Sequence, residues 1–105
     1  MEQQFIRHCE NGDLDGIKQI IKTHKINIHA EDEIGFKLAC VNGYLHIVEY
    51  LINLYKINPD YDTINIHAGD EYGFRLACYN GYLHIVEYLI NFGCYVRNYN
   101  NIIVL

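Results

Sequence analysis

Apolar and polar positions in residues 45–54 and 83–92 recur with the period of an α-helix. In each stretch two stripes are apolar and a single stripe is polar. The polar stripe consists of His46, Glu49 and Asn53 in the first stretch, and of His84, Glu87 and Asn91 in the second. A helix that is apolar on two sides is expected to pack between neighbours. The pattern therefore predicts two helices that lie inside a stack.

A shorter helix precedes each of these helices, at residues 36–42 in the first case. The Asn-Gly pairs at 11–12, 42–43 and 80–81 are expected to end the shorter helices, because glycine readily takes the left-handed conformation of a helix C-terminus. The segments INIHAEDE and INIHAGDE favour an extended or turn structure. The chain should thus form three helix pairs, beginning near residues 2, 34 and 72.

Residues 26–56 and 64–94 match at 24 of 31 positions, with an offset of 38 residues. Such a period is typical of stacked repeats, in which each unit buries its apolar face against its neighbours. We expect one domain over residues 1–105. Repeat 1 would cover about 1–26 as a polar cap, repeat 2 about 27–64, repeat 3 about 65–94, and a partial repeat 95–105. The apolar residues 102–105 would fold back over the last repeat.

The sequence GYLHIVEYLI, from Gly43 and again from Gly81, resembles the second half of an ankyrin repeat. The form D-x-x-G-F-[KR]-L-A-C-x-N-G-Y-L is similar to divergent ankyrin proteins of giant DNA viruses of the Mimivirus kind. This resemblance implies an all-α ankyrin-repeat solenoid of about three helix-turn-helix units with extended inter-repeat turns. It also implies a protein–protein interaction module that meets its partner at the turn tips and first helices.

The chain departs from the family pattern where the first helices begin. The usual Thr-Pro-Leu-His is IGFK from Ile34 and YGFR from Tyr72. A glycine there costs roughly 0.5–1 kcal/mol relative to alanine. We expect Asp32 and Asp70 to cap these helices instead of threonine, and the family's Thr/His hydrogen-bond ladder to be absent. The long period places an extra loop at residues 59–63.

Charge and hydropathy narrow the classes of partner. The net charge of −5 argues against nucleic acid and anionic membranes as partners, since both attract basic surfaces. No apolar run reaches the roughly 18 residues of a membrane span, and the first residues lack a signal-peptide core. We expect an intracellular protein, in the host cytoplasm if viral, that is not secreted and is monomeric, with self-association as an alternative.

Cysteine and histidine recur about once per repeat, which argues against shared sites. Cys9, Cys40 and Cys78 are equivalent, on helices roughly 8–10 Å apart. Because a disulfide needs Cα atoms within about 7 Å, we expect packing residues. Cys94 should be exposed. The equivalent pairs His29/His67 and His46/His84 would be too far apart to share a metal, so no metal site is predicted.

Catalytic motifs are missing from the sequence. It contains no serine, no phosphate-binding loop and no HExxH motif. The carboxylate pairs Asp32/Glu33 and Asp70/Glu71 fall in turns, where they favour helix capping. We therefore predict that the chain is not an enzyme and has no cofactor.

The two near-identical copies differ at seven positions, and four of these lie at the turn and first helix. The pairs are Glu31/Gly69, Ile34/Tyr72, Lys37/Arg75 and Val41/Tyr79. We take Lys37, Val41, Tyr72, Arg75 and Tyr79 as candidate partner-binding residues, because tyrosine and arginine are enriched in interface hot spots. Random drift at solvated positions is the alternative.

Asn58 is a candidate hydroxylation site, because the sequence from Leu51 to Asn58 resembles the L-x5-[VI]-N pattern hydroxylated in ankyrin repeats. The alternative for Asn58 is a simple turn residue. Other functional hypotheses are a short structural or decayed repeat-family member without a dedicated partner, and a ubiquitin-ligase substrate adaptor. The adaptor would need an F-box-like tail, for which residues 95–105 are too short.

Overall fold

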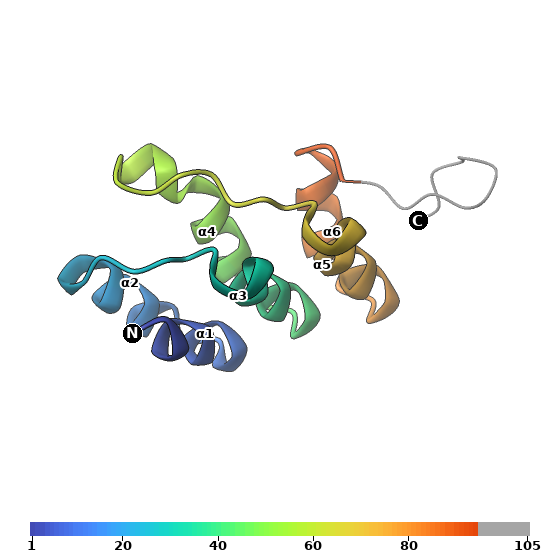
Figure 1. Ribbon diagram of the computed structural model, residues 1–105. Coiled ribbons are helices and arrows are strands. Elements are labelled where there is room, and N and C mark those ends of the chain that lie inside the picture. The colour runs from blue at the N-terminus through green and yellow to red at the C-terminus, as the bar shows by residue number, and fades with distance from the viewer. Residues whose placement is uncertain (95–105) are drawn as a thin grey trace.

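The computed structural model describes residues 1–94 and shows six α-helices arranged as three antiparallel pairs. The helices are α1 (Glu2–Asn11), α2 (Leu14–Thr23), α3 (Ala30–Val41), α4 (Leu45–Ile57), α5 (Ala68–Tyr79) and α6 (Leu83–Ile90). Figure 1 shows the pairs side by side in a row, joined by extended connectors. No strand occurs in residues 1–94. The predicted all-α solenoid is confirmed, whereas the predicted partial repeat and tail cap lie outside the described residues.

The first helices stack on one another through one large aromatic residue each. Phe5, Phe36 and Phe74 are fully buried in α1, α3 and α5, which pack in that order. A Cβ atom on Gly35 would lie 2.7 Å from the Phe5 ring. The glycine that replaces the family's proline therefore has a packing role, because it lets α3 approach α1 closely.

Two of the glycines that end the first helices are required for two reasons, their backbone conformation and the lack of space for a side chain. Gly12 and Gly43 take positive φ angles of 77° and 82°, which side chains disfavour. In addition, a Cβ on Gly12 would lie 2.8 Å from the Tyr44 ring, and a Cβ on Gly43 would lie 2.7 Å from the Tyr82 ring. Each tyrosine thus packs on the glycine of the preceding repeat.

The second helices are buried on two sides, as their pattern predicts. In α4 the buried residues are Ile47, Val48, Leu51, Ile52 and Leu54, and in α6 they are Ile85, Val86 and Leu89. Glu49 and Glu87 are exposed. The Asn53 side-chain amide donates to the Tyr88 hydroxyl at 2.7 Å, which links α4 to α6.

A left-handed turn opens both α3 and α5. Glu31, Asp32 and Glu33 have φ angles of 55°, 55° and 64°, and residues 69–71 repeat this conformation. Right-handed helix therefore begins near residues 34 and 72, as predicted. The expected capping by Asp32 and Asp70 is wrong, because both residues lie inside the left-handed turn. The Asp32 carboxylate accepts a hydrogen bond from Lys37 Nζ at 3.0 Å.

The extra loop of the second repeat is anchored to the connector before it. Tyr61 is buried, although the sequence places it in a turn. Its hydroxyl accepts from the Ile26 N–H and donates to the His24 carbonyl, both at 3.4 Å. The inserted residues thus satisfy backbone groups between repeats 1 and 2, which explains how the long period is accommodated.

Candidate functional site

Three of the five candidate binding residues come together at the turn end of α3 and α5. The Tyr72 ring, which is 39% exposed, lies beneath two cations. Lys37 Nζ and Arg75 Cζ are each 5.7 Å from its centroid. We call Lys37, Tyr72 and Arg75 the turn-end cluster. It joins neighbouring repeats, so it exists only in the stacked array.

Arg75 also stabilises the turn from which it projects. Its Nε donates to the Asp70 carbonyl at 2.9 Å, and a terminal nitrogen donates to the Gly69 carbonyl at 3.3 Å. These carbonyls belong to the left-handed turn, where the helical ladder does not continue. A substitution of Arg75 would therefore change both the surface and the turn.

The other two candidates lie at the opposite end of the same helices. Tyr79 closes α5 and is 87% exposed, while Val41 closes α3 and is partly buried. The Val41 carbonyl accepts from the Asn80 side chain at 3.0 Å. Seven residues separate Tyr72 from Tyr79, about 10 Å along a helix. The candidates thus form a strip along α3 and α5, which we call the binding strip, rather than one compact patch.

Glu33 is a buried carboxylate that the sequence analysis assigned to helix capping. Its side chain accepts from His29 Nδ1 at 2.9 Å and from the Asn65 backbone N–H at 2.6 Å. The residue is 4% exposed. The left-handed turn directs it inward, where it ties α3 to the start of the next repeat.

Glu2 forms the equivalent link one repeat earlier. Its carboxylate accepts from the Asn27 N–H at 2.9 Å. This hydrogen bond lowers the pKa of Glu2 below its ordinary value. Carboxylates thus connect each of the first two repeats to the next. The sequence does indicate this link, because an acidic residue recurs at equivalent positions of the three repeats, as Glu2, Glu33 and Glu71.

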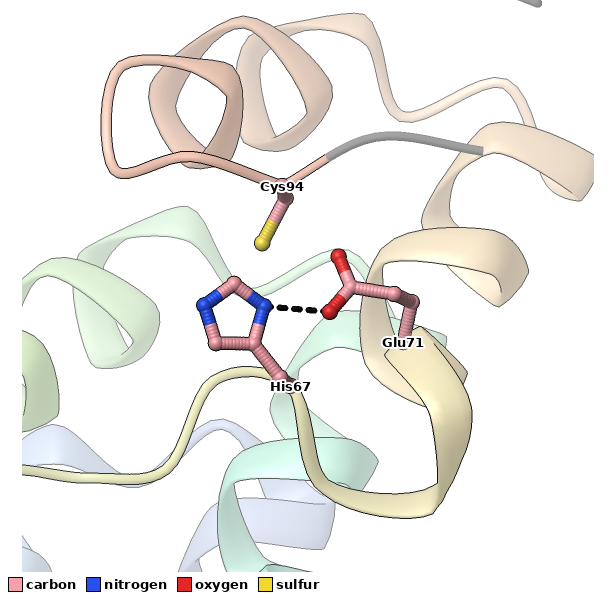
Figure 2. Close-up of side chains that lie close together, drawn as sticks. All are labelled: His67, Glu71 and Cys94. Carbon is pink, nitrogen blue, oxygen red and sulfur yellow. Dashed lines mark hydrogen bonds and ion pairs between the residues drawn. The ribbon is translucent and has the colours of Figure 1, made fainter. Parts of the chain in front are cut away.

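The third repeat brings a histidine, a carboxylate and a thiol together. Figure 2 shows His67 hydrogen-bonded to Glu71, with the Cys94 sulfur directed toward the His67 ring. One ligand atom from each residue lies within 4.8 Å of the other two. A comparison of equivalent histidines and cysteines in different repeats does not reveal this cluster. The three members occupy different positions of one repeat.

Cys94 is 3% exposed, so the prediction that it is exposed is wrong. Burial, together with the Glu71 carboxylate, raises the pKa of the Cys94 thiol to about 12. Cys9 and Cys40 are buried packing residues as predicted, while Cys78 is partly exposed.

Asn58 lies directly after α4 in an extended conformation. Its side-chain oxygen accepts from the Asp60 N–H at 3.1 Å, which holds the turn. This geometry gives Asn58 a structural role beside the predicted modification. No helix in the described part of the chain is long and apolar enough to cross a membrane.

Comparisons with known proteins identify the repeat. A family model described as ankyrin repeats (3 copies) matches residues 5–100. A protein of Acanthamoeba polyphaga mimivirus that is named as an ankyrin repeat protein is 32% identical over 56 residues. This match covers 53% of the chain and only 9% of the viral protein. No solved structure matches the chain significantly. With three stacked helix pairs and a family match along nearly its whole length, the chain belongs to the ankyrin repeat family.

Proposed function

We propose that this chain is a protein-interaction module that holds a partner protein on the binding strip of α3 and α5. Ankyrin repeats act as interaction modules across their family. The observation that carries the proposal is Tyr79, a large aromatic side chain that is 87% exposed at the end of α5. Tyrosine anchors of this kind dominate the energetics of many interfaces.

The charges along the strip indicate what kind of partner would fit. Glu31, Asp32 and Asp70 are exposed at the turn tips. Lys37 and Arg75 lie behind them, over Tyr72. A partner with basic groups opposite the turn tips and an apolar pocket opposite Tyr79 would match these exposed carboxylates and this exposed tyrosine. The strip is small for a stable interface, so we expect modest affinity.

The proposal includes no catalysis and no cofactor. It also includes no nucleic-acid partner, in keeping with the net charge of −5. The similarity to a mimivirus protein supports the further proposal that the chain is a viral protein acting inside the host cell. Its partner would be a host or viral protein.

A photo-crosslinking amino acid placed at Tyr79 tests the binding strip. In host-cell lysate it should yield a discrete cross-linked protein, identified by mass spectrometry, that the Lys37→Ala variant captures less. The same crosslinker at Glu49, on the exposed stripe of α4, is the matched control. Capture of that protein from Glu49 but not from Tyr79 would contradict the proposed surface. Arg75 is unsuitable for this test because its guanidinium bonds two backbone carbonyls of the turn, whereas Lys37 bonds only the exposed side chain of Asp32.

One observation favours a second role, as a segment of a longer array or a self-associating unit. Gly12 and Gly43 are covered by Tyr44 and Tyr82, but a Cβ on Gly81 would meet nothing within 4 Å among the described residues. Leu83 beside it is exposed. Sedimentation of the chain would show concentration-dependent association if this face pairs with a second copy. A Leu83→Glu variant should then remain monomeric.

A further inference from the structure

We propose that His67, Glu71 and Cys94 form a binding site for a divalent cation of the zinc class. The three side chains come from two segments, the turn that opens α5 and the short stretch after α6, in which Cys94 lies four residues beyond Ile90. Their ligand atoms lie within 4.8 Å of one another (Figure 2). Zinc binds imidazole nitrogen, thiolate sulfur and carboxylate oxygen, and this set offers one of each. The site is independent of the proposed partner surface.

The preceding repeat shows which part of this cluster is structural and which part is new. There, His29 Nδ1 bonds Glu33 in the same way, and Glu33 also accepts from the Asn65 N–H. A His–Glu pair therefore belongs to the repeat itself and needs no metal. In repeat 2 the buried residue before Asn65 is Ile64, which offers no ligand atom. Within residues 1–94, only the His–Glu pair of repeat 3 has a third donor beside it, Cys94.

The ligand atoms need only small movements to coordinate a metal. In tetrahedral coordination at bond lengths of about 2.0–2.3 Å, neighbouring ligand atoms are roughly 3.3–3.7 Å apart. The present limit of 4.8 Å exceeds this by about an ångström. The His67 side chain is 51% exposed and free to adjust, while Glu71 and Cys94 are largely enclosed. Asn65 holds the turn, since its side-chain oxygen accepts from the His67 N–H at 3.1 Å.

The electrostatics of the cluster also suit a cation. Without a metal, burial and the neighbouring carboxylate keep the Cys94 thiol protonated at neutral pH. A divalent ion placed among the three groups would offset both effects, and a coordinating thiol is deprotonated outright. On binding, the thiol loses one proton to the buffer. The neutral His67 ring binds through one nitrogen and carries its single proton on the other, so its proton count does not change. No group is oxidised or reduced, and the exposed side of His67 leaves the fourth position to water.

Cobalt(II) is a direct probe of this site, because a cobalt–thiolate bond gives a charge-transfer band in the near ultraviolet. Titration of the reduced, metal-free chain of residues 1–105 should give this band with one cobalt per chain, and zinc should displace it. Cys94→Ser should abolish the band. His67→Ala, which changes an exposed side chain and leaves the thiol in place, should weaken metal binding by on the order of tenfold or more.

Two matched variants separate this site from its alternatives. His29→Ala removes the equivalent histidine of repeat 2, and Cys9→Ala removes a thiol outside the cluster. Both should keep the band and the cobalt affinity of the unchanged chain, with folding checked by circular dichroism. The proposal would be overturned by the absence of a band in the unchanged chain. It would equally be overturned by a band that survives Cys94→Ser, or by loss of binding in His29→Ala with His67→Ala unaffected.

Discussion

Replacing Glu33 with alanine should destabilise the array more than any other change of an acidic side chain in the same turn. The carboxylate is 4% exposed and accepts from His29 Nδ1 at 2.9 Å and from the Asn65 N–H at 2.6 Å. Hydrogen bonds to a charged group contribute about 1.5–3 kcal/mol. Because His29 and Asn65 can regain water when the carboxylate is lost, we expect a net loss of about 2 kcal/mol, which is less than the two bonds together would contribute.

Thermal unfolding followed by circular dichroism measures this loss. For a domain of this size, about 2 kcal/mol corresponds to a fall in melting temperature of roughly 8–16 °C. Glu31→Ala is the matched control, because Glu31 lies in the same left-handed turn but is exposed, and its carboxylate accepts from the Gln3 side chain at 2.9 Å. It should change stability by no more than about 0.5 kcal/mol. Equal melting temperatures for the two variants would refute the role assigned to Glu33.

Three further predictions concern other parts of the chain. Glu31→Gly should raise the melting temperature by a few degrees, because φ is 55° at Glu31 and the next repeat has Gly69 there; an unchanged or lower value would argue against strain in this turn. The lowered pKa of Glu2 means that its hydrogen bond contributes stability above the ordinary carboxyl pKa of about 4.3 and loses it as the pH falls through the folded-state pKa. Urea titrations at neutral and at acidic pH measure this effect. The free energy of unfolding should fall less between the two pH values for Glu2→Gln than for the unchanged chain, and equal falls would contradict this link. Thiol labelling of the native chain should modify Cys78 first, because the other three cysteines are buried; faster labelling of Cys94 would show that its cover opens.

The sequence by itself determined the helices and their stacking. The double apolar stripe at 45–54 requires a partner on two sides, and the Asn-Gly pairs require a chain reversal. Both are local properties, since they depend on residues within one or two helical turns. The near identity of residues 26–56 and 64–94 then implies that the same packing is used again. The positions of Lys37, Tyr72 and Arg75 on one face could be predicted for the same reason.

Only the tertiary structure decided which distant residues meet. Glu33 reaches Asn65 and Tyr61 reaches Ile26, over 32 and 35 positions of sequence. Cys94 is buried and lies next to His67 and Glu71, in the turn that opens α5, although it follows α6 in the sequence. These contacts depend on the register of one repeat on the next and on a left-handed turn that directs a charged side chain inward. A hydrophobic pattern reports which face of an element is buried, but it carries no information about which atoms lie opposite that face.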